Sequence, residues 1–277
     1  MDRLSLITRG RSVTERIVGP QVAEIVTKRT YCRTFFRARE WRNLALGVFA
    51  SFEEAAAYCE SNHTVPHYEL YLDHRQWLQR QMRLRAHDYP VILWLTRLVS
   101  SAPSVIDVGG SVGVSYYAFS RLLPNADQYR WQVLELPHVV KTGREIADQR
   151  GCRALSFVER WEELVLPADV LLCAGAAQFL PVDLSDRLQS LSPSERPRSV
   201  IVNRVPIHPT RTYVTLQNTG ASITPCKVYA HEQFVGAFTA LGLRLIDEWN
   251  CPENDLVIPY HPELSIPGFR GFCLGPA

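Results

Sequence analysis

From residue 104 to the C-terminus, short apolar and β-branched runs alternate with longer stretches whose apolar positions recur at helical spacing. This pattern predicts seven strands, at residues 104–109, 130–136, 154–158, 168–174, 199–206, 243–249 and 269–274. It predicts helices between them, notably at residues 112–123, 138–150, 183–191 and 231–241. Such alternation is typical of an α/β fold in which helices cover both faces of a mostly parallel sheet. The last two strands, joined by the Pro-rich segment 252–267, are expected to form an antiparallel hairpin.

The first hundred residues lack this alternation and show only helical patterns, at residues 21–36, 51–59, 71–87 and 90–100. The sequence Ser51-Phe52-Glu53-Glu54 has the spacing of a capping box, in which a serine and a glutamate satisfy free amides at a helix start. We therefore predict a helical N-terminal region over residues 1–101, serving as a lid or a dimerisation surface of a homodimer. The second domain is expected over residues 102–277.

Composition favours a soluble protein with a sizeable core. The chain has 277 residues, of which 46% are hydrophobic, enough for one large domain with an appendage. Its seven cysteines are odd in number and scattered without a C-x-x-C pair, which favours a reducing cytoplasm. No stretch approaches the roughly 18 apolar residues of a membrane span, so we expect cytoplasmic localisation and no membrane association.

Charge is unevenly distributed, although the net charge is only +2. Residues 1–42 contain ten Lys and Arg against four Asp and Glu, a local charge of +6. Such a run could contact an anionic partner, but it is more often a solvated helix face. We therefore predict no nucleic-acid partner.

A glycine-rich turn follows the first strand of the α/β region, in the sequence Val105-Ile-Asp-Val-Gly-Gly-Ser-Val-Gly113. Glycines let a backbone approach a ligand closely, and the following helix start offers free amides. A dinucleotide fingerprint needs glycine at its first, third and sixth positions, and counted from Gly109 the last two are Ser111 and Val114. The loop therefore does not match that fingerprint.

A carboxylate ends the next predicted strand, since Glu135 lies 22 positions after Gly113. In sheets of this type an acid at this place can accept hydrogen bonds from both ribose hydroxyls of a nucleoside. The combination of Asp107, the glycine turn and Glu135 predicts a nucleoside-bearing cofactor. The alternative is a tight strand-to-helix turn beside a solvated glutamate.

The loop and the segment Glu135-Leu-Pro-His-Val-Val140 resemble class I S-adenosylmethionine-dependent methyltransferases, particularly small-molecule O-methyltransferases. The chain also resembles a family of bacterial methyltransferases linked to surface-polysaccharide or secondary-metabolite gene clusters. The segments that carry this likeness are Gly47-Val-Phe49, Ser51–Ala55, Asp88-Tyr-Pro90, Asp107–Gly113, Gln178–Pro181, Asn203-Arg204 and Val214–Gln217.

The resemblance implies a Rossmann-like, seven-stranded methyltransferase sheet of order 3-2-1-4-5-7-6 whose last strand is antiparallel. It also implies S-adenosylmethionine as cofactor and methyl transfer to a small-molecule or glycan-type acceptor, most simply at oxygen. The loop acid and glycines would hold the amino-acid end of the cofactor. Ser111 stands where the family commonly has glycine, and a small hydroxyl residue still fits there. The cofactor-binding residues expected at the loop and next strand are Asp107, Gly109, Gly110, Ser111, Gly113, Glu135 and Leu136.

Three further residues are candidates for cofactor contact. Ala174 and Gly175 end the fourth strand with small side chains, which would make room for the methionine part, although close packing explains them equally well. Trp161 follows the third strand and could stack on adenine, or simply cover the core.

Candidates for action on the acceptor follow the fifth strand. His208 is a possible general base, although a loop histidine is more often a solvated surface group. Arg204, beside Asn203, could bind an anionic acceptor through paired hydrogen bonds, or form a salt bridge at the rim of the sheet. The histidines lack metal-ligand spacing, so we predict no metal.

Two other functions stay open at this point. One is an NAD(P)-dependent oxidoreductase on a related sheet, which Ser111 and Val114 disfavour. The other is a non-catalytic, cofactor-binding scaffold that docks a partner protein through its N-terminal helices.

Overall fold

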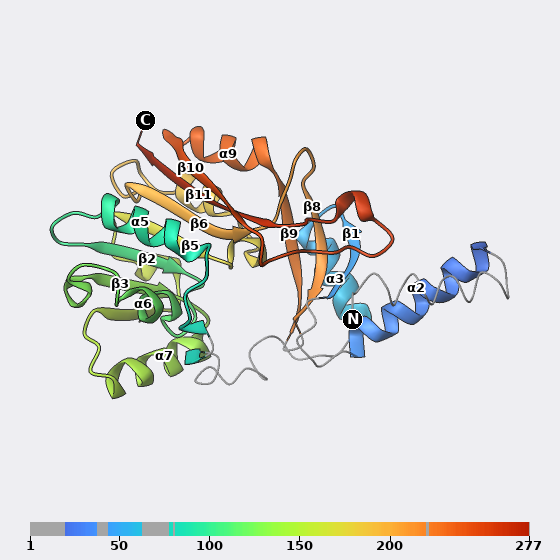
Figure 1. The fold of residues 1–277 in the computed structure, drawn as a ribbon, viewed down its shortest axis with the longest axis horizontal. Helices are drawn as coiled ribbons and strands as arrows, with labels where there is room; N and C mark the ends of the chain where they lie inside the picture. Colours follow the sequence, from blue (N-terminus) through green and yellow to red (C-terminus); the bar gives the residue numbers. More distant parts are fainter. Residues whose placement is uncertain (1–19, 38–43, 63–77, 80, 220–221, 277) are drawn as a thin grey trace. The chain divides into compact units, whose positions relative to one another are not determined.

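The computed structural model describes residues 20–37, 44–62, 78–79, 81–219 and 222–276 (Figure 1). The chain divides into two compact units, each assembled from separate stretches of sequence. The small unit comprises Met1–Tyr71, Tyr213–Lys227 and Leu256–Pro267, and the large unit comprises Leu72–Thr212, Val228–Asp255 and Gly268–Ala277. This division differs from the predicted single boundary near residue 102, because later segments complete the small unit.

The large unit contains the predicted seven-stranded sheet, in the order β4-β3-β2-β5-β6-β11-β10 (Figure 1). Counted from β2 along the chain, this order is 3-2-1-4-5-7-6, which confirms the prediction. Strands β2 to β6 run parallel, and β11 is antiparallel to both β6 and β10. The strands are β2 (Ser104–Val108), β3 (Arg130–Leu134), β4 (Leu155–Val158), β5 (Val170–Ala174), β6 (Ser199–Val205), β10 (Leu243–Cys251) and β11 (Phe269–Pro276).

Alternating side chains of these strands face two helical layers, as the period of a β-strand requires. On one face, the Tyr116 ring of α6 lies 5.6 Å from the Trp131 ring of β3, and α5 and α7 contact β6 and β4. On the other face, Ile106 of β2 shares a buried core with Phe234 and Phe238 of α9 and with residues of α8. The helices are α5 (Asp88–Leu98), α6 (Val114–Phe119), α7 (Pro137–Gln149), α8 (Leu184–Gln189) and α9 (His231–Thr239), with the 3₁₀ turns η2 (Ala126–Gln128) and η4 (Ala177–Phe179).

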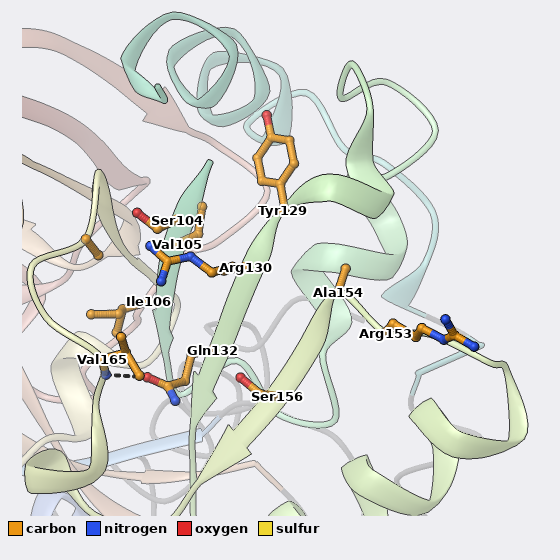
Figure 2. A pocket seen from close by; sticks show the side chains of 11 residues that line it. Ser104, Val105, Ile106, Tyr129, Arg130, Gln132, Arg153, Ala154, Ser156 and Val165 are labelled. Atoms are coloured by element: carbon orange, nitrogen blue, oxygen red, sulfur yellow. Dashed lines mark hydrogen bonds between the residues drawn. The ribbon is translucent and has the colours of Figure 1, made fainter. Parts of the chain in front are cut away.

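The connection from β4 to β5 is the one place where the helical layer is thin. Residues 159–169 are all described and contain only the 3₁₀ turn η3 (Trp161–Glu163). A cavity of about 180 Å³ opens near the beginnings of β2, β3 and β4, at the edge of the sheet opposite the glycine-rich loop (Figure 2). There the Val165 N–H donates a 2.8 Å hydrogen bond to the side-chain oxygen of Gln132, which ties the connection to the sheet.

The small unit is not wholly helical, which corrects the prediction for the N-terminal region. Its elements are α2 (Pro20–Arg37), β1 (Leu44–Phe49), α3 (Phe52–Asn62), β8 (Tyr213–Asn218), the 3₁₀ turn η5 (Pro262–Leu264) and the first part of β9 (Ile223–Ala230). Strand β1 pairs antiparallel with β8, and the end of β9 pairs with β7 (Ile207–His208) of the large unit. Phe35, Phe36, Ala55, Val214 and Leu216 form its buried core.

The local signals of the N-terminal region were interpreted correctly only in part. The Glu54 N–H donates to Ser51 Oγ at 3.1 Å at the start of α3, which confirms the predicted serine cap. Of the helix predicted at residues 71–87, residues 71–77 and 80 lie outside the described residues, and residues 82–87 form turns and irregular structure, so the prediction is wrong for that part. The lid and dimerisation roles of the N-terminal region stay predictions.

All seven cysteines are free thiols. Among the helices that the structure describes, none has the length and apolar character needed to cross a bilayer.

Candidate functional site

The glycine-rich loop lies at the carboxyl end of β2 and packs against two neighbouring strands. Gly109 and Gly113 have φ of +69° and +88°, a region that favours glycine. A Cβ on Gly109 would lie 2.3 Å from the Cβ of Ala176, and one on Gly113 would lie 2.9 Å from Leu155. Both glycines are therefore required by the shape of the loop and by its close contacts.

Asp107 lies buried beneath this loop, and only one of its two carboxylate oxygens has a hydrogen-bond partner among the described residues. Trp131 Nε1 donates to Oδ2 at 3.2 Å, while Oδ1 has no hydrogen-bond partner among the described residues. Burial raises the pKa of Asp107 to about 7. A Cβ on Gly110 would lie 2.5 Å from the carboxylate, so glycine is needed above it as well.

Glu135 faces the same loop from the end of β3. The Ser111 N–H donates to Oε1 at 3.1 Å, and the Leu136 N–H donates to Oε2 at 2.9 Å. Ser111 has φ of +54°, and its buried hydroxyl oxygen has no hydrogen-bond partner within the described part of the chain. The structure thus brings the second predicted acid next to the loop.

The remaining cofactor candidates lie along the same edge of the sheet. Trp161 is in η3, directly after β4, and its ring packs against the core while its buried Nε1 lacks a described partner. Ala174 ends β5, and Gly175 follows it with φ of +84°. All predicted cofactor residues therefore gather at the carboxyl ends of β2, β3, β4 and β5, where open α/β sheets bind ligands.

Asn203 is fully buried and committed to protein partners. Its carbonyl oxygen accepts hydrogen bonds from Trp249 Nε1 at 3.0 Å and Cys251 Sγ at 3.4 Å, and its amide donates to the His87 carbonyl at 3.2 Å. These bonds favour a structural role, in place of the predicted catalytic one.

His208 is likewise engaged, because its Nδ1 accepts hydrogen bonds from the N–H groups of Thr210 at 3.1 Å and Arg211 at 3.0 Å. An Nδ1 that accepts cannot carry the proton of the neutral ring, so these bonds assign that proton to Nε2. Neither nitrogen then presents a free lone pair, which argues against the predicted role as general base.

Arg204 reaches back from β6 to the end of β5, where its Nη2 donates to the Ala174 carbonyl at 2.6 Å. The salt bridge considered for it at the sheet rim is not formed, since no carboxylate of the described residues lies within 4.0 Å of its guanidinium.

His87 is a buried polar residue outside the set of predicted catalytic and cofactor-binding residues. It is 1% exposed, and neither ring nitrogen has a hydrogen-bond partner among the described residues. Nδ1 lies 3.5 Å from Glu253 and Nε2 lies 3.6 Å from Asp88. Burial, together with the nearby positive charge of Arg204, lowers the pKa of His87 to about 4, so the ring is neutral at pH 7. Its only signal in the sequence is its position before the Asp88-Tyr-Pro90 segment.

No metal centre is apparent among the described residues, which contain no group of three or more His, Cys, Asp or Glu side chains able to hold an ion.

Comparison with known proteins gives structural neighbours only. No family model matches the chain, and no curated protein matches it. The 1,6-didemethyltoxoflavin-N1-methyltransferase of Burkholderia thailandensis, solved with S-adenosylhomocysteine, aligns over 83% of this chain and 92% of its own at 14% identity and a TM-score of 0.51.

Two further neighbours align less well. OxaC, solved with sinefungin and meleagrin, matches 70% of this chain at 13% identity and a TM-score of 0.48, and the match spans only 48% of OxaC. The mitomycin 7-O-methyltransferase MmcR matches 93% of this chain and 71% of its own at 14% identity and a TM-score of 0.44. The chain thus has the Rossmann-like α/β fold found in methyltransferases, as the similarity to the Burkholderia protein shows.

Proposed function

We propose that this protein is an S-adenosylmethionine-dependent methyltransferase that methylates a small-molecule or glycan-type acceptor, at oxygen. The family resemblance suggests an acceptor from surface-polysaccharide or secondary-metabolite biosynthesis. The observation that carries the proposal is the pairing of a glycine-rich loop over buried Asp107 with Glu135 turned toward that loop from the next strand.

The residues at this edge of the sheet fit such a cofactor. Asp107 Oδ1, Ser111 Oγ and Trp161 Nε1 are buried without hydrogen-bond partners in the described residues, and buried polar groups are ordinarily paired. In the proposed complex, Asp107 receives the ammonium of the cofactor's amino-acid arm and Glu135 its ribose hydroxyls. Trp161 borders the adenine, and Ala174 and Gly175 leave space for the arm.

The bound cofactor supplies a methyl group on a positively charged sulfur, which is already activated for in-line displacement. The protein's task is then to hold donor and acceptor close and aligned. We propose no histidine base at His208, because the ring lacks a free lone pair. A His208→Gln variant that binds cofactor normally but loses more than about tenfold in methyl transfer would restore that role.

Calorimetric titration with S-adenosylhomocysteine tests the proposal on the full chain. We expect saturable binding by the wild-type protein, and at least tenfold weaker binding by Glu135→Ala, which loses two charge-assisted hydrogen bonds to the ribose. Glu232→Ala, an exposed acid on α9, is the matched control and should bind as the wild type does. Absence of binding by the wild-type protein would refute the proposal.

The oxidoreductase alternative is less well supported. Antiparallel β11, inserted between β6 and β10, is the arrangement expected of a methyltransferase sheet and not of a dinucleotide-binding one. A thermal-shift screen in which NAD(P) stabilises the protein more than S-adenosylhomocysteine does would reverse this preference.

A further inference from the structure

Arg204 forms no salt bridge with the described residues, although the charges of Asp88 and Asp107 act on it from beyond 4.0 Å. Its Nε is buried and has no hydrogen-bond partner among the described residues, and its Nη2 is bonded only to a neutral carbonyl, that of Ala174. Its backbone has φ of +59°, a region that side-chain-bearing residues rarely adopt. A guanidinium that is partly buried and not directly paired with a carboxylate is costly, so its position indicates a negatively charged ligand.

The position of the guanidinium shows which part of the site such a ligand would occupy. A Cβ on Gly175 would lie only 3.1 Å from the guanidinium carbon, so the absence of a side chain there lets Arg204 lie against the end of β5. The next residue, Ala176, contacts Gly109 of the glycine-rich loop. Gly175 therefore contacts the Arg204 guanidinium, and Ala176, the next residue, contacts the glycine-rich loop. These two small residues place the guanidinium close to the loop.

Asp107 and Arg204 provide opposite charges at this place. They lie more than 4.0 Å apart, too far for a direct salt bridge, yet the charge of each acts on the other. Each also keeps one buried polar atom without a hydrogen-bond partner among the described residues, Oδ1 of Asp107 and Nε of Arg204. An α-amino acid group, with an ammonium and a carboxylate on one carbon, would satisfy both atoms at once.

We infer that Arg204 binds the carboxylate of the methyl donor's amino-acid arm, while Asp107 binds the ammonium of the same arm. This inference rests on the proposed function and gives Arg204 a role in holding the cofactor, in place of the acceptor-binding role suggested by the sequence. A guanidinium bound to a carboxylate makes charge-assisted hydrogen bonds, which are stronger than neutral ones.

Three nucleosides test the inference by calorimetry on the full chain. S-adenosylhomocysteine carries both charged groups of the arm, its decarboxylated analogue keeps only the ammonium, and 5′-methylthioadenosine has neither. The wild-type protein should bind S-adenosylhomocysteine about 10- to 100-fold more tightly than the decarboxylated analogue. This comparison needs no variant, so it does not depend on how a substitution affects folding.

Arg204→Gln should weaken the binding of S-adenosylhomocysteine by a similar factor and leave the affinity for 5′-methylthioadenosine unchanged. Arg204→Lys should lose an intermediate amount of affinity for S-adenosylhomocysteine. The control is Arg198→Gln, which changes an exposed arginine directly before the start of β6. It should change neither affinity.

Equal affinity of the wild-type protein for S-adenosylhomocysteine and its decarboxylated analogue would overturn the inference. An Arg204→Gln variant that binds S-adenosylhomocysteine normally would also overturn it. Arg204 would then remain a candidate for binding an anionic acceptor. If the wild-type protein binds 5′-methylthioadenosine but shows no preference for the charged arm, the inference fails while the proposed function stands. If it binds none of the three, both fail.

Discussion

At the scale of single residues, the protonation of Asp107 is the property most open to measurement. Burial raises its pKa to about 7, so near neutral pH a fraction of the ligand-free protein carries a proton on this carboxyl group. A cofactor ammonium placed beside it would favour the ionised form. Binding and deprotonation of Asp107 are therefore expected to be coupled.

The affinity for S-adenosylhomocysteine should fall as pH decreases below about 7, because the proton on Asp107 must then be displaced, and should level off above that value. The predicted slope approaches tenfold per pH unit on the acid side. Calorimetry between pH 5.5 and pH 8.5, in buffers of different ionisation enthalpy, measures both the affinity and the proton released. Asp107→Asn should remove the pH dependence, and a flat wild-type profile would contradict the prediction.

His87 makes a separate prediction about stability. Its pKa of about 4 in the folded protein lies below the ordinary value of 6.5, so the unfolded chain binds the proton more readily. The free energy of unfolding should therefore fall as pH decreases from about 6.5 to about 4, by up to about 3 kcal/mol from this residue. Urea denaturation of the wild type and His87→Gln at pH 7 and pH 4.5 isolates the effect, since only the wild type should show this component. Equal pH dependence in the two proteins would count against a neutral buried ring.

For single residues, the sequence indicated which side chains lie at the ends of the strands, but not which hydrogen-bond partners those side chains have. Asp107 and Glu135 could be predicted because each ends a strand at a characteristic spacing. The commitment of Asn203 and His208 to protein partners could not, since Asn203 is bonded to His87 and Trp249, 116 and 46 positions away. The absence of a direct salt bridge to Arg204 among the described residues depends on the same long-range arrangement.

At the scale of elements, the turn between β2 and α6 combines the tightest contacts of the site. Gly110→Ala would place a Cβ about 2.5 Å from the Asp107 carboxylate, so either the loop or the carboxylate must move. We expect at least tenfold weaker binding of S-adenosylhomocysteine, measured by calorimetry. Gly236→Ala in α9 is the matched control, because a Cβ there meets nothing within 4 Å. Normal binding by Gly110→Ala would show that the loop adapts without loss.

The predicted elements succeeded for the large sheet, where each of the seven strands was identified within a few residues, including β10 with its charged side chains. The strands of the small unit were missed, and apolar β1 lies in the region where only helical patterns were predicted. Strand β8 is buried throughout yet contains Thr215, Gln217 and Asn218. Thr215 Oγ1 donates to the Gly47 carbonyl at 2.8 Å, and the Asn218 amide donates to the Phe35 carbonyl. Because of these polar residues, the alternation of apolar and polar positions did not predict strand β8.

At the scale of the whole molecule, the small unit depends on segments far apart in the sequence. Its core joins Phe35, Phe36 and Ala55 to Val214 and Leu216 of β8, and β1 pairs only with β8 in the structure described. Local sequence patterns predicted the large sheet because successive strand–helix repeats build most of it. They could not predict an interleaved unit, whose pairings span about 170 positions.

A fragment of residues 1–101, the N-terminal region predicted from sequence, should therefore not fold alone. Without β8 it lacks the partner of β1 and two of the five residues of the buried core, so the apolar side chains that β8 covers are exposed to water. We expect no cooperative thermal transition by circular dichroism and poor dispersion in amide spectra. A folded, cooperatively melting fragment would show that the unit is independent of Tyr213–Lys227.

The missing helix between β4 and β5 has a consequence for the choice of nucleoside. Trp161 lies in a short connection whose Val165 N–H is bonded to the Gln132 side chain of β3, and the only helical element described in this connection is the 3₁₀ turn η3. Because Leu164 lies in the buried core and Trp161 and Leu166 pack against it, replacing these ten or so residues would alter both the surface offered to a purine ring and the hydrophobic packing beneath it. Under the proposed function, a change of base preference made in this connection is therefore expected to require compensating changes in the core side chains that it supplies.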